Sequence, residues 1–73
     1  MNRMLDEREE LAETILQTRT KLYAYLKVNK ITQVEGAEML GISRQHLNRV
    51  LNGATLPSLP LLQRMINLVE KDK

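Results

Sequence analysis

The stretch TQVEGAEMLGISRQHLNRVLNG, from Thr32 to Gly53, decides the fold of this chain of 73 residues. Thr32 can cap a helix, and Glu35 three residues later completes a capping box. Gly41 suits the left-handed position that ends a helix, and Ser43 soon after it can cap another helix. Gly53 suits the same left-handed conformation at the end of that second helix. The stretch therefore predicts two short helices joined by a tight turn, which is the helix-turn-helix unit.

The residues inside this stretch allow the two helices to cross at close range. Ala37 is a small residue on the first helix, and Gly41 turns the chain at the corner without a side-chain clash. Leu47 and Val50 then fill the space between the helices. The inward positions that we expect are Ala37, Leu40, Leu47, Val50 and Leu51.

The outer face of the second helix carries the chemistry. Its polar residues span an arc of about 140° and are Arg44, Gln45, Asn48, Arg49 and Asn52. Arginine can bridge O6 and N7 of guanine, and glutamine or asparagine can bridge N6 and N7 of adenine. The face carries no acidic residue, whereas a solvated helix face usually mixes both signs of charge. This pattern predicts that the helix 43–52 reads base edges in the major groove of double-stranded DNA.

Helical periodicity extends to both sides of the central stretch. Residues from about Met4 to Val28 predict one long amphipathic helix, or two helices in near register. Its two neighbouring apolar stripes are Met4, Leu11, Ile15, Leu22 and Leu26, and Leu5, Ala12, Leu16 and Tyr23. Ser58 can cap a last helix within residues 58–71, with Leu62, Met65, Ile66 and Val69 as its inner face.

Four apolar residues fall outside the predicted core arcs: Val34, Met39, Leu61 and Leu68. A domain this small cannot cover all of its apolar surface, so they can be ordinary exposed residues. The other interpretation is a dimer or partner surface. The long N-terminal helix favours the second interpretation, because so small a domain can bury only part of its two stripes.

The charge is distributed unevenly although the net charge is only +2. Residues 1–13 carry two basic and five acidic residues, whereas residues 14–64 carry seven basic and two acidic residues. A basic body of this kind can dock on phosphate.

The chain has no Cys and a single His, His46, so we expect no enzyme, no cofactor and no metal site. His46 lies at the flank of the outer face, where it contacts DNA or stays an exposed spectator. The absence of a long apolar run and of a secretory signal predicts a soluble, intracellular protein. Together with DNA binding, this predicts a cytoplasmic, nucleoid-associated location.

A longer pattern is similar to a known family. The run Thr32-Gln33-x-x-x-Ala37-x-x-Leu40-Gly41-Ile42-Ser43-Arg44-x-x-Leu47-x-x-Val50-x-Asn52-Gly53, followed by Pro57-Ser58-Leu59, resembles the Cro/CI (XRE-type) phage-repressor family over about residues 22–69. The resemblance implies a single compact all-α, lambda-repressor-like domain of four helices, with a fifth in some relatives, here with an extended first helix. Residues 1–13 would form an acidic helical extension of that domain.

The resemblance also implies a role for individual residues. Gln33 would contact phosphate, and Ser43, Arg44, Gln45 and Arg49 would face bases or nearby phosphates. Asn52 and the loop after it, with Thr55, would offer polar groups to the DNA backbone. The sequence departs from the family pattern at Val34, Gly36, Met39 and Leu51. Gly36 replaces a large apolar residue, which lowers helix propensity by about 1 kcal/mol relative to Ala.

The hypothesis that follows is a phage, prophage or mobile-element repressor that binds a DNA operator, usually as a homodimer on a two-fold site. An alternative is a protein-interaction module, such as an antitoxin or a regulator partner, that uses the helix-turn-helix as scaffold and binds through its N-terminal helix. A third hypothesis is an architectural protein that bends DNA with little base preference.

Overall fold

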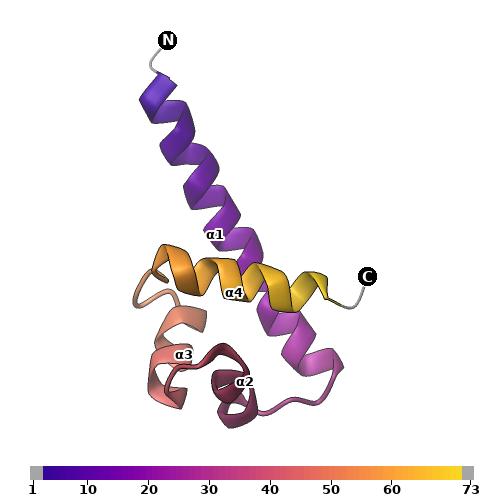
Figure 1. Cartoon of the computed structure of the whole chain (residues 1–73). Coiled ribbons are helices and arrows are strands. Elements are labelled where there is room, and N and C mark those ends of the chain that lie inside the picture. The colour runs from indigo at the N-terminus through magenta and orange to yellow at the C-terminus, as the bar shows by residue number, and fades with distance from the viewer. Residues whose placement is uncertain (1–2, 72–73) are drawn as a thin grey trace.

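The computed structural model describes residues 3–71, with side chains from Arg8 onward. Its helices are α1 (Arg3–Val28), α2 (Gln33–Leu40), α3 (Arg44–Leu51) and α4 (Leu59–Glu70). Over this range every regular element is a helix, which confirms the all-α fold class, and none of these helices has the length and apolar character to cross a membrane. α1 is one uninterrupted helix, while α4 crosses it and α2 and α3 pack below (Figure 1). The predicted stripe residues Met4 and Leu5 lie outside the side chains described.

Hydroxyl side chains begin three of the helices, as predicted. The Oγ1 of Thr32 accepts a hydrogen bond from the backbone N–H of Glu35 at 3.1 Å, and the Thr32 N–H donates to Glu35 Oε1 at 2.9 Å. At the starts of α3 and α4, the hydroxyl oxygens of Ser43 and Ser58 accept hydrogen bonds from the backbone N–H groups of His46 and Leu61. Each cap satisfies a backbone donor that the first helical turn leaves without a partner.

Left-handed residues end the first three helices. Gly41 and Gly53 follow α2 and α3 with φ of 73° and 78°, as their sequence positions predict. Lys30 takes the same role after α1, with φ of 56°, and the N–H of Ile31 reaches back to the carbonyl oxygen of Leu26 at 2.8 Å. Such a cap normally favours glycine, so the residue type at position 30 does not reveal it.

The capping box should make stability depend on pH. The Thr32 backbone N–H, and then its hydroxyl, donate to the Glu35 carboxylate and hold the pKa of that carboxyl below its ordinary value of 4.5. A lowered folded pKa means that the carboxylate stabilises the fold above pH 4.5 and that this contribution is lost as the pH falls through the folded pKa. We expect Glu35→Gln to flatten the acid limb of the stability curve, measured as urea midpoints by circular dichroism. An unchanged acid limb in the variant would contradict this assignment.

The core lies where the second half of α1 meets the other three helices. Its buried apolar residues are Leu22, Leu26, Ala37, Leu40, Leu47, Val50, Leu61, Leu62, Met65 and Leu68. Val34 and Met39 are half-exposed, as predicted. The prediction that Leu61 and Leu68 form an exposed surface is wrong, because they are only 3% and 9% exposed. α4 packs against both α1 and α2, so its buried arc turns toward these two residues, and Ile66 is only partly buried.

Gly36 lies where α2 packs against Leu26 of α1 and Leu47 of α3. A Cβ atom at this position would lie 3.0 Å from Cδ2 of Leu26 and 3.4 Å from Cδ2 of Leu47. The space that a large residue at position 36 would need is therefore occupied by Leu26. Gly36 keeps the core filled by letting α2 approach α1, which a count of helix propensities alone does not reveal.

Candidate nucleic-acid interface

Packing fixes which side of α3 faces outward. Leu47 and Val50 are almost completely buried, with 0% and 1% of their surface exposed. The exposed residues of α3 and its C-terminal cap are the predicted ones: Arg44, Gln45, Asn48, Arg49 and Asn52. Arg44 begins the helix, and Arg49 lies in its last turn. The structure thus places two guanidinium groups and three amides on one solvent-facing surface.

A hydrogen-bonded row of amides joins α2 to α3. The Nδ2 of Asn52 donates to Oδ1 of Asn48 at 3.0 Å, and Nδ2 of Asn48 donates to Oε1 of Gln33 at 3.2 Å. Gln33 is the first residue of α2, so the row fixes the start of one helix against the outer face of the other. With its oxygen engaged, Gln33 has its amide nitrogen to offer, and that donor suits a phosphate oxygen.

An open, polar hollow of about 550 Å³ lies between the two helices on this side. Its lining residues are Gln33, Arg44, Gln45 and Asn48. The hollow offers amide and guanidinium groups from two helices, which are the side-chain types that contact phosphates and base edges. The structure therefore brings Gln33 together with three residues of the predicted reading face.

Three other residues that we expect to contact DNA, Ser43, His46 and Thr55, also take part in contacts within the domain. The Oγ of Ser43 accepts the N–H of His46 at 3.1 Å, and the His46 side chain is partly buried. Thr55 is also partly buried, and its backbone N–H donates to the carbonyl oxygen of Arg49 at 3.3 Å. Thr55 therefore retains its hydroxyl, and not its N–H, for a contact with DNA. No group of three or more metal-ligating side chains occurs in the described part of the chain.

Two arginines outside the predicted site, Arg19 and Arg64, contact the chain at the ends of the two helices of the motif. A Cβ atom at Gly53 would lie 2.7 Å from Nη1 of Arg19, so the α1 guanidinium packs on the turn that ends α3. The Nη1 of Arg64 donates to the carbonyl oxygen of Leu40 at 3.3 Å, at the end of α2. In the sequence, Arg19 falls together with Arg8 inside the apolar arc of the long N-terminal helix, and this position is the signal that could have singled it out.

The comparison with protein families settles the class of the domain. A family profile described as helix-turn-helix matches residues 22–72, which include α2, α3 and α4. The chain belongs to the helix-turn-helix family of the Cro/CI (XRE) type. Membership of this family implies DNA binding, and the family is not enzymatic. No curated protein and no solved structure gives a match to this helix-turn-helix chain.

Proposed function

We propose that this helix-turn-helix protein is a sequence-specific transcriptional regulator, of the type represented by phage, prophage and mobile-element repressors. One observation carries the proposal: the outer face of α3 holds Arg44, Gln45 and Arg49, without an acidic residue, opposite a buried apolar face. Two copies would occupy a two-fold operator, because a symmetric pair of modules reads two half-sites. Its place of action would be the cytoplasm, at the nucleoid.

The proposed contacts divide into reading and positioning. Arg44, Gln45 and Arg49 would bridge base edges in the major groove, where each good bidentate pair discriminates by about 1–3 kcal/mol. Gln33, at the N-terminus of α2, would hold a phosphate and set the register. The further contacts that we propose are Ser43, His46, Asn48, Asn52 and Thr55. Asn48 would act partly through Gln33, because the two amides are hydrogen-bonded.

The direct test is selection of DNA by the wild-type chain from a library of random duplexes. We expect an enriched motif with two-fold symmetry, bound more tightly than a scrambled duplex in fluorescence anisotropy. The logarithm of the affinity should fall linearly with the logarithm of the salt concentration, by about 0.9 per phosphate contact. Weak binding that depends on salt but not on sequence would contradict the proposal and favour an architectural or purely protein-binding role.

A further inference from the structure

The first half of α1 extends beyond the folded body (Figure 1). Thr18 is the first buried residue among the α1 side chains described, and from Arg8 to Gln17 only Ile15 is even partly buried. A helix in a protein gains most of its stability from the packing of an apolar face. The folded body supplies little of that packing to this segment, so its apolar side chains are open to a partner.

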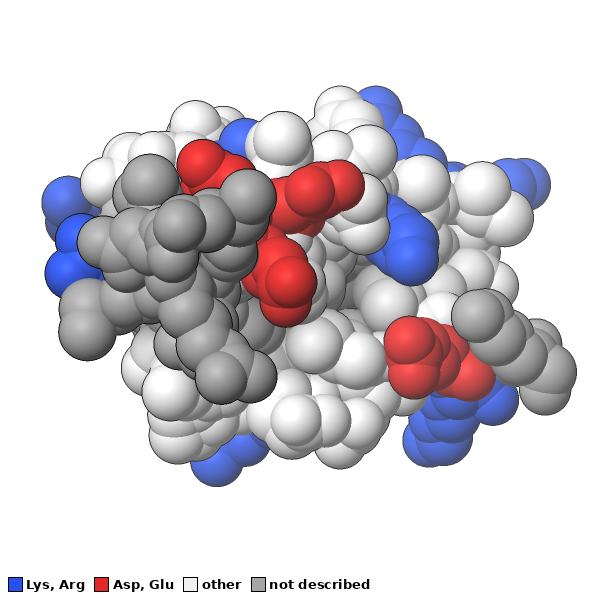
Figure 2. All heavy atoms as spheres, turned by 90° about the horizontal axis from the view of Figure 1, so that it is seen from above, with Lys and Arg blue, Asp and Glu red and all other residues white. Residues whose placement is uncertain are grey.

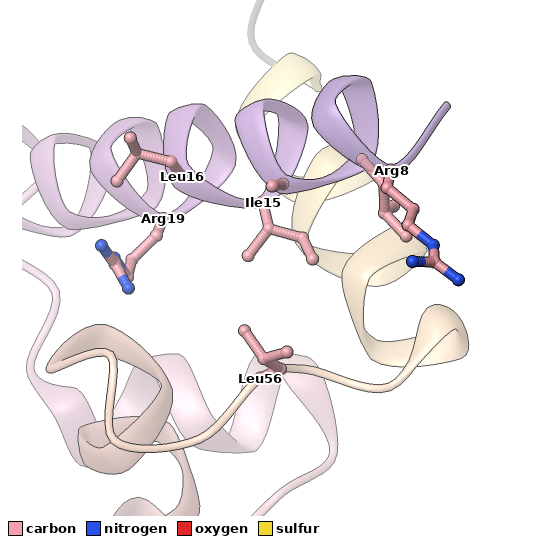
Figure 3. Close-up of a pocket in the computed structure, with 7 residues that line it drawn as sticks. Arg8, Ile15, Leu16, Arg19 and Leu56 are labelled. Carbon is pink, nitrogen blue, oxygen red and sulfur yellow. The ribbon is translucent and has the colours of Figure 1, made fainter. Parts of the chain in front are cut away.

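The projecting segment and the loop before α4 form an apolar groove of about 350 Å³. Its apolar lining residues are Leu11, Ala12, Ile15, Leu16 and Leu56. Ile15 and Leu56 point toward each other across the groove (Figure 3). Leu11, Leu16 and Leu56 are 45%, 52% and 71% exposed. Small-molecule sites bury about 70–90% of their ligand, which so open a groove does not do, whereas exposed apolar patches are typical of protein interfaces.

Two guanidinium groups lie at the ends of the apolar groove. Arg8 and Arg19 flank its apolar residues (Figure 3), and no acidic residue is among the described residues that line it. The carboxylate of Glu13 accepts a hydrogen bond from Nε2 of Gln17 at 3.1 Å, on another side of α1. Figure 2 shows acidic side chains gathered in the middle of the upper face and most basic ones toward its outline. An occupant of the groove therefore needs apolar side chains between two negative charges.

The spacing of the guanidiniums defines the shape of that occupant. Arg8 and Arg19 are 11 residues apart, which corresponds to about three helical turns and about 16 Å. Between them the backbone of α1 is bonded within the helix, so the occupant receives no backbone hydrogen bonds from α1 and has to satisfy its own. A second helix that lies along α1 meets this requirement, as in other complexes in which a helix occupies a groove.

We propose that the apolar groove binds an acidic amphipathic helix of another protein, with a carboxylate at each end of an apolar stripe and 11 positions between the two. These carboxylates would lie beside Arg8 and Arg19, and the stripe would cover the apolar residues between them. A second copy of this chain does not fit the groove. Its α1 presents the same two arginines on this face, and antiparallel alignment of the two grooves would place Arg19 of one chain beside Arg8 of the other.

The site is separate from the surface that is proposed to read DNA, because no residue of α3 lines the groove. The two surfaces are nevertheless neighbours. Arg19 borders the groove and also packs on Gly53, the residue that follows the cap of α3. Leu56, on the far side of the groove, lies three residues after Gly53. A bound helix would therefore contact a side chain that holds the turn after the reading helix.

Selection of peptides by the full chain tests the docking site. The probe is a displayed library of helical peptides of about 18 residues, long enough for three turns between the acids and a turn at each end, with Ala, Leu, Gln, Lys or Glu at each position. We expect the enriched peptides to carry two glutamates 11 positions apart, with leucines between them on the same face. Enrichment of peptides without that pair, or none beyond that in a parallel selection on Leu11→Glu, overturns the proposal.

Anisotropy of an enriched peptide, measured without DNA, tests the apolar contact. We expect Leu11→Glu to weaken binding by about 10- to 100-fold, the effect of losing one buried leucine. Leu59→Glu is the matched control and should bind like the wild type, since Leu59 is 68% exposed and does not line the groove. Circular dichroism of the same samples checks the helical content. Equal binding by the two folded variants overturns the proposal.

A charge exchange tests the guanidiniums. Arg8→Glu replaces an exposed ion pair by two like charges, so we expect about 3- to 10-fold weaker binding. Binding should recover when the glutamate at one end of the peptide, and not the one at the other end, is replaced by lysine. Lys21→Glu makes the same change in net charge at an exposed position outside the groove and should have little effect. Failure of the peptide change to restore binding, or equal weakening by Lys21→Glu, overturns the proposal.

Two other occupants are outcomes of the same tests. A wild-type dimer in sedimentation equilibrium that Leu11→Glu dissociates and Leu59→Glu does not would assign the groove to a second copy and overturn the proposal. Binding to phosphatidylglycerol vesicles that Leu11→Glu loses, without any enriched peptide, would assign it to a lipid surface and also overturn it. Because none of these measurements contains DNA, a chain that binds the peptides but selects no DNA overturns only the proposed function.

Discussion

Replacing Arg44 and Arg49 together by alanine is expected to weaken binding to the selected operator by about 30- to 20,000-fold. Each bidentate arginine contact with guanine discriminates by about 1–3 kcal/mol, and about 1.4 kcal/mol is a tenfold change in affinity. Both side chains are exposed, so the variant should keep the helical content and thermal stability of the wild type. Fluorescence anisotropy with the selected duplex, beside circular dichroism of the same samples, measures both quantities.

The control for this result is the pair Lys21→Ala and Lys71→Ala. Both lysines are exposed and lie outside α3, so this variant loses the same net charge without touching the proposed reading face. We expect the control to weaken binding to operator and scrambled duplexes alike. Arg49→Lys adds a second comparison, because lysine keeps the charge but loses the planar fork. Operator binding by Arg44→Ala/Arg49→Ala that equals the control would contradict groove reading through α3 and favour the protein-interaction alternative.

Local rules allowed the sequence to predict the helix boundaries of the central motif. The residues that begin or end its helices, which are Thr32, Gly41, Ser43 and Gly53, bond to atoms only a few residues away. A helix start or end of this kind can therefore be predicted without knowing the rest of the fold. The reading face of α3 was predictable for a related reason. Leu47 and Val50 are spaced for burial on one side, and the polar residues opposite them then have to face solvent.

Contacts between distant parts of the chain could not be predicted in this way. The hydrogen bond from Asn48 to Gln33 joins residues 15 positions apart, and no periodicity encodes it. Leu61 and Leu68 were misplaced because periodicity gives the apolar side of α4 but not the number of helices that cover it. The packing of Arg19 on Gly53 depends on how α1 lies over the turn after α3, which is a property of the assembled fold.

Gly36 shows the same limit in the core. Its low helix propensity suggested a weak point in α2, yet the structure places Leu26 where a larger residue would extend. The two positions therefore share one volume, and the size of each side chain is constrained by the other. Close packing in protein interiors makes such pairs sensitive to a change in either member.

This shared volume leads to the largest expected effect on stability. We expect Leu26→Ala to lower the free energy of unfolding by about 2–5 kcal/mol, because it opens a cavity among buried side chains. Gly36→Leu alone should lower it by about 1–3 kcal/mol, since its Cβ meets Cδ2 of Leu26 at 3.0 Å and the added atoms overpack the core. A chain of this length has a total stability of roughly 4–11 kcal/mol, so either loss is measurable by urea unfolding.

The double variant Leu26→Ala/Gly36→Leu distinguishes a shared volume from two independent defects. The leucine at position 36 can enter the space that is left when Leu26 is shortened to alanine. The loss of free energy of unfolding in the double variant should therefore be smaller than the summed losses of the two single variants, by about 0.5–3 kcal/mol. Leu26→Ala/Ala24→Leu is the control, because Ala24 is exposed and a leucine there adds apolar surface without reaching the cavity. Additive losses in the first pair, or equal recovery in the control, would show that Gly36 and Leu26 do not determine each other's size.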